Sequence, residues 1–145
     1  MQNLNIRPFE TPDLSPLLAC WEAASRIAHP FLSEEFISEE LKNIPEVYMP
    51  VAETWVAEQD GRLAGFIALI DNEIGGLFVF PDCQRHGIGA ALLGKAIDLR
   101  GELEVEVFEE NPVGRSFYEK QGFQYIGESV FDRTGDKVRR MRRSL

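Results

Sequence analysis

The stretch LFVFPDCQRHGIGAALL, residues 77–93, decides the fold of this chain. Its apolar first part predicts a strand that stops at Pro81, and the glycines Gly87 and Gly89 open an apolar helix. Because these two positions carry no side chain, the backbone N–H groups of residues 84–90 can converge on an anion, aided by the positive end of the helix dipole. The stretch therefore predicts a phosphate-binding turn between a strand and a helix.

Two common phosphate-binding motifs do not fit this turn. A P-loop would align on Gly94 and Lys95, but Ala96 stands where a hydroxyl should meet magnesium. A Rossmann motif needs a third glycine where the chain has Leu92. It also needs the first βα unit of a parallel sheet, whereas antiparallel strands and a hairpin come first here. The turn therefore belongs to another class of phosphate site.

The whole chain predicts one α/β (α+β) domain over residues 1–145, with the element order β-α-α-β-β-β-α-β-α-β-β. Asp60-Gly61 predicts a two-residue hairpin turn, and Asp71-Asn72 predicts another turn. Gly75-Gly76 lies inside a strand, which indicates a bulge, a splayed edge or a closely approaching ligand. Pro45 and Pro50 are expected to end the second helical region. The expected strands are 4–9, 53–58, 63–70, 74–80, 103–108, 123–131 and 138–143, and the expected helices are about 14–28, 33–44, 87–99 and 112–121.

Composition and charge exclude several classes of function. With 145 residues, 44% hydrophobic and 27% charged, the chain is typical of a globular domain. Its longest apolar stretches, such as residues 66–70, are too short to cross a bilayer, and the N-terminus lacks a signal-peptide pattern. Cys20 and Cys83 form no disulfide framework and have no metal-ligand spacing. We therefore expect a cytoplasmic protein with no metal and no membrane partner.

The net charge of −9 argues against general nucleic-acid binding. The same charge favours cationic small molecules, or it merely keeps the protein in solution. Basic residues gather between Lys137 and Arg143, where they alternate as in a strand. This alternation favours charge balance with acidic neighbours or phosphates over nucleic-acid binding.

Residues 84–89, QRHGIG, match the Q/R-x-x-G-x-G/A signature of the GNAT superfamily of N-acetyltransferases. The strand before them resembles the family's fourth strand. Residues 111–123 resemble its N-x-x-A…F/L-Y-x-x-x-G-F segment, with Gly114 in place of the usual alanine. Residues 29–33, HPFLS, are similar to a small single-domain bacterial branch, the YjaB-like acetyltransferases. The resemblance covers essentially the whole chain and implies a mixed, mostly antiparallel sheet of about seven strands with helices on both faces.

The resemblance implies that acetyl-CoA is the cosubstrate. Its acetyl group would pass directly to a primary amine of a small molecule, a protein lysine or a protein N-terminus. The backbone amides near the glycines would bind the pyrophosphate, and the fourth strand would pair with the pantetheine arm. A backbone N–H near Val79 would polarise the thioester carbonyl. The implied cofactor-binding residues are Leu77, Phe78, Val79, Gln84, Arg85, His86, Gly87, Ile88, Gly89, Ala90, Asn111 and Tyr118.

Asn111 and Tyr118 each have a functional and a structural interpretation. Asn111 would bind the pantetheine amide, or it caps the helix that begins at Pro112. Tyr118 would protonate the leaving CoA thiolate, because a phenol and a thiol have comparable pKa values of roughly 10 and 8.5. Alternatively it is a core tyrosine beside Phe117 and Phe123. We expect Tyr118 to be the catalytic residue.

The sequence does not single out the base that removes the proton from the acceptor ammonium. Acidic residues at strand ends are often only solvated, and a histidine between two helices is often only packed. An alternative function is an acyl-CoA-binding sensor on the same fold without turnover. We expect Trp21 and Trp55 in the core, and a monomer or a homodimer. The candidate bases are His29, Glu53, Asp71, Glu73 and Glu109, of which His29, Glu53 and Glu73 are also candidates for the acceptor site.

Overall fold

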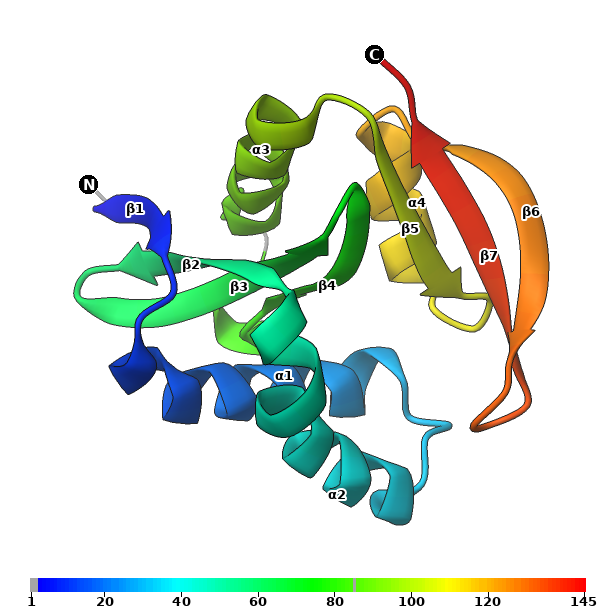
Figure 1. The fold of residues 1–145 in the computed structure, drawn as a ribbon, viewed down its shortest axis with the longest axis horizontal. Helices are drawn as coiled ribbons and strands as arrows, with labels where there is room; N and C mark the ends of the chain where they lie inside the picture. The colour runs from blue at the N-terminus through cyan, green and yellow to red at the C-terminus, as the bar shows by residue number, and fades with distance from the viewer. Residues whose placement is uncertain (1–2, 85) are drawn as a thin grey trace.

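The computed structural model describes residues 3–84 and 86–145 of the chain (Figure 1). Its strands are β1 (Leu4–Pro8), β2 (Glu53–Gln59), β3 (Arg62–Ile70), β4 (Glu73–Val79), β5 (Leu103–Phe108), β6 (Gln124–Phe131) and β7 (Asp136–Arg143). Its α-helices are α1 (Leu14–Ala28), α2 (Glu34–Asn43), α3 (Ile88–Arg100) and α4 (Pro112–Lys120). The expected order of strands and helices is therefore confirmed.

The strands form one seven-stranded sheet in the order β1-β2-β3-β4-β5-β7-β6. All neighbouring strands are antiparallel except β4 and β5, which are parallel. Figure 1 shows α1 and α2 on one face of the sheet and α3 and α4 on the other. The expected mixed, mostly antiparallel sheet with helices on both faces is confirmed.

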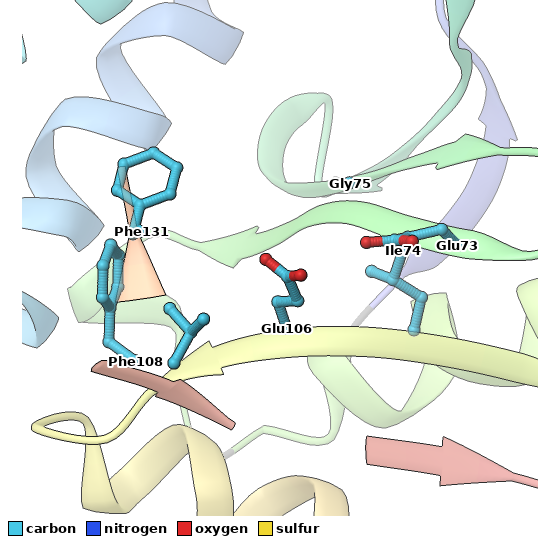
Figure 2. Close-up of a pocket in the computed structure, with 7 residues that line it drawn as sticks. Glu73, Ile74, Gly75, Glu106, Phe108 and Phe131 are labelled. Atoms are coloured by element: carbon cyan, nitrogen blue, oxygen red, sulfur yellow. The ribbon is translucent and has the colours of Figure 1, made fainter. Parts of the chain in front are cut away.

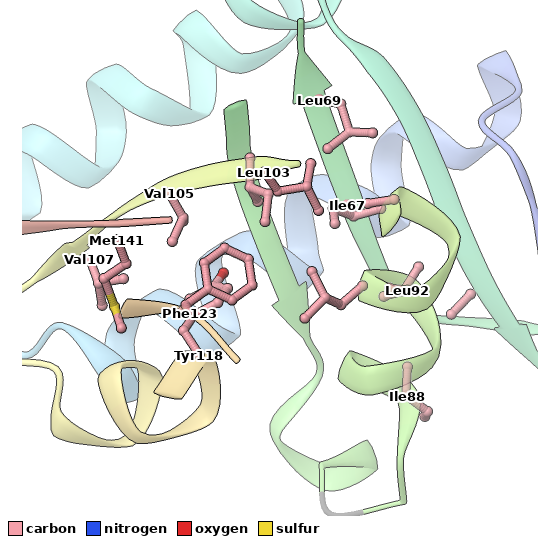
Figure 3. Close-up of a cluster of buried hydrophobic side chains, with 14 of the residues drawn as sticks. Ile67, Leu69, Ile88, Leu92, Leu103, Val105, Val107, Tyr118, Phe123 and Met141 are labelled. Carbon is pink, nitrogen blue, oxygen red and sulfur yellow. The ribbon is translucent and has the colours of Figure 1, made fainter. Parts of the chain in front are cut away.

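Each face of the sheet has its own apolar core. Under α3 and α4, the side chains of Leu92 and Ile67 are fully buried in one cluster (Figure 3). Under α1 and α2, Leu17, Trp21 and Val56 belong to a second cluster. Full burial of each such aliphatic side chain contributes about 1.5–3 kcal/mol, so both helical layers are held to the sheet mainly by apolar packing.

The predicted turns are present, but one predicted helix end is wrong. Asp60 and Gly61 have φ values of 53° and 82°, the geometry that a two-residue hairpin prefers, and Asp71 turns the chain into β4 with φ 54°. Pro45 does not end the helical region, which continues through a π-helical turn at Ile44–Tyr48. Pro45 stands in the first turn of that segment, where proline is tolerated, although it lacks the N–H that would continue the hydrogen bonding of α2.

A bulge at Gly75 bends β4, in agreement with the sequence. Ala68 of β3 lies opposite Gly76, and the next residue, Leu69, lies opposite Ile74. Gly75 is therefore the extra residue that has no partner on β3. Because β4 bends there, its second half is free to diverge from the strand on its other side.

Strands β4 and β5 pair only over a short distance. Glu73 lies beside Glu104 and Ile74 beside Val105, and the parallel register ends there. Beyond these two pairs the strands separate toward their C-terminal ends (Figure 1). The splayed edge that Gly75-Gly76 indicates is thus present as a slot between β4 and β5, and it leaves one edge of β4 without a strand partner.

The basic residues of β7 are paired with acidic side chains. Arg139 contacts Glu109 at 2.7 Å, and Arg142 contacts Glu104 at 3.0 Å. The interpretation of this stretch as charge balance is therefore confirmed. In the described part of the chain, no helix is long and apolar enough to cross a membrane.

Candidate functional site

The turn before α3 has the geometry of an anion site. Gly87 caps the helix with φ 77°, a left-handed conformation that side chains of L-residues disfavour. The first helical hydrogen bond of this end runs from the Ala91 N–H to the Gly87 carbonyl. The preceding N–H groups therefore point out of the helix N-terminus, where an anion can accept hydrogen bonds from them.

Gly89 lies where the helix meets the end of β4. A Cβ atom at this position would stand 3.5 Å from the Phe117 ring and 3.9 Å from the Val79 side chain. The amide of the Gln84 side chain donates to the Val79 carbonyl at 3.2 Å, so the turn is tied to the strand before it. Arg85, for which we expected a pyrophosphate contact, lies outside the described residues.

A cavity of about 190 Å³ lies where β4 and β5 separate. Figure 2 shows the Glu106 carboxylate reaching from β5 toward β4 across this gap. Phe108 and Phe131 lie at one end of the cavity, and Glu73 lies at the other. We call this space the slot cavity. Its polar groups are carboxylates, so it offers a place for a cationic group.

One arginine forms ion pairs with three carboxylates at this cavity. Arg140 of β7 contacts Glu73 at 2.9 Å, Glu104 at 2.8 Å and Glu106 at 2.9 Å. Its hydrogen bonds to Glu73 and Glu104 raise the pKa of Arg140 above its usual value, so the guanidinium stays charged. Even with Arg142 beside Glu104, the group keeps a net negative charge that attracts an ammonium ion.

Glu106 is a site residue that the sequence interpretation missed. Alternation along β5 places the side chains of Glu104, Glu106 and Phe108 on one face of the strand. That alternation is the signal in the sequence that groups Glu106 with Glu104 and Phe108 on one face. The sequence alone gives no reason to prefer this glutamate to the others, since its approach to β4 depends on how the sheet opens.

A second cavity, of about 390 Å³, lies between the sheet and helices α1 and α2. Gly75, Phe108 and Phe131 line both cavities, so the second one adjoins the slot. We call it the helical cavity. Most of its wall consists of aromatic and aliphatic side chains. Its polar lining residues are Ser25, His29, Glu40, Tyr48 and Thr54.

His29 lies in the helical cavity beside the open end of the slot. Its ring packs edge-on against Phe31 and Phe108, with centroids 5.7 and 4.9 Å away. Burial lowers the pKa of His29 to about 4, so the ring is neutral at pH 7. Its Nε2 lies 3.3 Å from the side-chain nitrogen of Asn111, which can donate to the neutral ring. Asn111 also accepts a hydrogen bond from the Gly114 N–H at 3.0 Å, so the cap interpretation of Asn111 is confirmed.

The low pKa of His29 predicts a loss of stability in mild acid. Between pH 6.5 and 4 the unfolded chain binds a proton that the folded His29 does not, so the free energy of unfolding falls as the pH is lowered. We expect a loss of about 3 kcal/mol over this interval, from 1.36 kcal/mol for each pH unit. Urea unfolding of the wild type and of His29→Gln at pH 7 and 4 measures the difference.

The glutamine variant should lose much less stability over the same interval, and His86→Gln, on the exposed turn before α3, serves as the matched histidine control. Parallel losses in the wild type and His29→Gln would show that another group titrates.

Tyr118 is a buried residue of α4. Its ring packs against Phe117 and Phe123, each with centroids 5.2 Å away, and Figure 3 shows it within the cluster under α3 and α4. The core interpretation is therefore confirmed, and it does not exclude a chemical one. Burial raises the pKa of the Tyr118 phenol well above its usual value, so the group keeps its proton at neutral pH. It can act as a proton donor.

The remaining candidates lie in different surroundings. Glu73 lines the slot cavity, whereas neither cavity, as the described residues define it, includes Glu53. Glu53 contacts Arg100 at 2.8 Å and the Trp55 indole at 2.8 Å, and these bonds lower its pKa. Glu109 is held by Arg139, which lowers the pKa of that carboxyl. Trp55 is only partly buried, whereas Trp21 is in the core as expected.

The sheet opens after its fourth strand, and a glycine turn and a helix N-terminus lie at the opening, which is the arrangement expected from the resemblance to the N-acetyltransferases. The chain belongs to the GNAT acetyltransferase family, because the model of the acetyltransferase (GNAT) domain matches residues 50–125. Peptidyl-lysine N-acetyltransferase YjaB of Escherichia coli (strain K12) is 33% identical over 134 residues, which cover 91% of this chain and 90% of that protein. The resemblance to this superfamily and to its YjaB-like branch is confirmed.

Solved structures agree with this assignment. The solution structure of apo-form YjaB from Escherichia coli has a TM-score of 0.87 and 29% identity, over 97% of both chains. The PaiA N-acetyltransferase from Thermoplasma acidophilum, solved in complex with coenzyme A, has a TM-score of 0.76 and 25% identity, over 99% of both chains. The chain is therefore an acetyl-CoA-dependent N-acetyltransferase, and the enzyme is favoured over the sensor alternative.

Proposed function

We propose that the chain holds acetyl-CoA in the opening between β4 and β5 and transfers the acetyl group to a primary amine that enters from the helical cavity. The observation that carries this proposal is the end of β4–β5 pairing after two residue pairs. Tyr118 and the helical cavity lie on opposite faces of the sheet. The sheet separates them everywhere except at the opening between β4 and β5. A donor in the opening is accessible from both faces.

The donor is bound by backbone groups in this proposal. The N–H groups at the N-terminus of α3, next to Gly87 and Gly89, hydrogen bond to the pyrophosphate. The free edge of β4, from Leu77 to Val79, pairs with the pantetheine amides as an added strand would, and the Asn111 side chain adds a contact. The bare Cα of Gly89 leaves room for the ligand beside Val79 and Phe117.

The chemistry is a direct attack of nitrogen on the thioester carbon. The new C–N bond forms as the C–S bond breaks, and the departing sulfur takes a proton from the Tyr118 hydroxyl. The nitrogen then releases its second proton to solvent, and the Tyr118 oxygen regains a proton from solvent after CoA leaves. The acceptor must first lose a proton from its ammonium group. Glu106 accepts that proton, because its carboxylate reaches into the slot cavity, which adjoins the helical cavity.

The acceptor is a primary amine, and the name of YjaB, a peptidyl-lysine N-acetyltransferase, supports a protein lysine as one such acceptor. A thiol-release assay with acetyl-CoA and a panel of primary amines tests the function, with the acetylated product identified by mass spectrometry. We expect thiol release and N-acetylated product in equal amounts. Binding of CoA without release for any amine would instead support the sensor.

Three further expectations from the sequence stay predictions. They are a single domain, a cytoplasmic location, and a monomeric or homodimeric state.

The Glu106→Gln variant tests the proposed base. We expect kcat to fall by about 100-fold near pH 7, the lower end of what proton transfer contributes, with little change in the KM for acetyl-CoA. The loss should shrink at higher pH, because a larger fraction of the amine is then already unprotonated. A pH profile of kcat measures both effects.

Glu104→Gln is the matched control for this experiment. Glu104 contacts the same arginine as Glu106 but does not line the slot cavity. Its variant should keep kcat within about threefold, since a partly exposed ion pair contributes little. Equal losses in the two variants, or a loss in Glu106→Gln that does not depend on pH, would remove Glu106 from the proton path.

A further inference from the structure

We propose that this chain prefers a small monoamine with an aromatic body over a protein lysine, and that this amine fills the helical cavity while its nitrogen lies at the slot. This inference rests on the proposed amine acetylation and names its substrate class. It starts from the difference between the two cavities. The slot cavity carries Glu73 and Glu106, whereas the helical cavity is mostly apolar.

The wall of the helical cavity is suited to an aromatic group. Trp21, Phe36, Phe78, Phe108 and Phe131 all line it. Several of these rings already contact one another edge-on, such as Phe108 and Phe131 at 5.6 Å between centroids. Aromatic pairs of this kind favour a further ring in the same arrangement, beyond the gain from burial alone. A volume of about 390 Å³ lies in the range of small-molecule sites.

The polar side chains of α1 and β2 offer no hydrogen bond to a molecule in the helical cavity. Ser25 Oγ and Thr54 Oγ1 have no hydrogen-bond partner among the described residues, but both atoms are enclosed by the protein itself. The surface that a bound molecule meets is therefore chiefly aromatic and aliphatic.

The charges of the cavity favour a single ammonium over a polycation. Among the described residues that line it, Glu40 is the one carboxylate, and it is already bonded to Arg133 and to the Tyr48 hydroxyl at 2.9 Å. Arg133 also lies over the Phe36 ring, 4.6 Å from its centroid. A second ammonium group in this cavity would be buried without a free counter-charge and near a guanidinium, which is unfavourable.

Amines of similar basicity test the inference. At saturating acetyl-CoA and fixed pH, we expect kcat/KM for 2-phenylethylamine to exceed that for n-butylamine and for a lysine peptide by roughly tenfold or more, as ring burial predicts. Spermidine should be a poorer acceptor than n-butylamine. A spermidine or lysine-peptide value equal to or above that of 2-phenylethylamine would overturn the inference and leave acetylation standing. No turnover with any amine would overturn the proposed function, and the inference with it.

Substitutions that fill the helical cavity provide a second test of the aromatic acceptor site. Ala68→Leu places a larger side chain from β3 at the wall of the helical cavity, and Ser25→Leu does so from α1 if the first variant does not fold. Either should lower kcat/KM for 2-phenylethylamine by roughly tenfold and leave n-butylamine within about twofold. Ile27→Ser, on the exposed side of α1, is the control. A loss of equal size for both amines would contradict the aromatic site.

Discussion

Replacing Tyr118 by phenylalanine should lower kcat for amine acetylation by about 100-fold or more, while the affinity for acetyl-CoA stays within about twofold. The phenol keeps its proton at neutral pH because burial raises its pKa. In the variant the thiolate must leave without that donor. The ring itself is retained, so its packing against Phe117 and Phe123 should persist. Steady-state kinetics and calorimetric titration of acetyl-CoA measure the two quantities.

Tyr125→Phe makes the same chemical change away from the site. Tyr125 lies exposed on β6, where its hydroxyl donates to Glu119 at 2.7 Å. This control should keep full activity, because an exposed hydrogen bond contributes little to stability. Unchanged kcat in Tyr118→Phe would remove that tyrosine from the mechanism. A loss of kcat that comes with a large loss of unfolding free energy would show a structural role instead.

The Gly89→Asp substitution should weaken acetyl-CoA binding by about 100-fold or more without destabilising the fold. An aspartate in the first turn of α3 interacts favourably with the helix dipole, by about 0.3–1 kcal/mol, so stability should hold or rise slightly. The same carboxylate would occupy the space beside Val79 and compete with the pyrophosphate for the N–H groups at the helix N-terminus. Stability and affinity are therefore expected to change independently.

Gly94→Ala is the matched change in the same helix. A Cβ at Gly94 would have no atom within 4 Å, so the alanine adds no clash. It should raise the free energy of unfolding by about 0.5–1 kcal/mol, because glycine is unfavourable inside a helix, and leave acetyl-CoA affinity unchanged. If the Gly89→Asp variant still binds acetyl-CoA with wild-type affinity, the cosubstrate does not bind at the N-terminus of α3.

Local signals in the sequence predicted most of the fold. Asp60-Gly61 and Asp71 specify turns through their backbone conformations, and Gly75 specifies the bulge because it lies inside a strand. Pro45 misled because its effect depends on where a new helical segment begins, which packing decides. The signals that succeeded involve neighbours in sequence, and the one that failed depends on tertiary structure.

The site was predictable only in part for the same reason. The glycine turn and the Asn111 cap are local patterns, and both are found. The group of carboxylates around Arg140 is assembled from β4, β5 and β7, so no stretch of sequence contains it. The helical cavity likewise depends on how far α1 and α2 stand from the sheet.

The most direct test of the central claim is a crystal structure of this protein with coenzyme A bound. We expect the pyrophosphate at the N-terminus of α3, the pantetheine arm along the free edge of β4, and the sulfur within hydrogen-bond distance of the Tyr118 hydroxyl. The amine side of the sulfur should face Glu106 across the slot cavity. A sulfur atom outside the opening between β4 and β5, or one beyond the reach of Tyr118, would contradict the account.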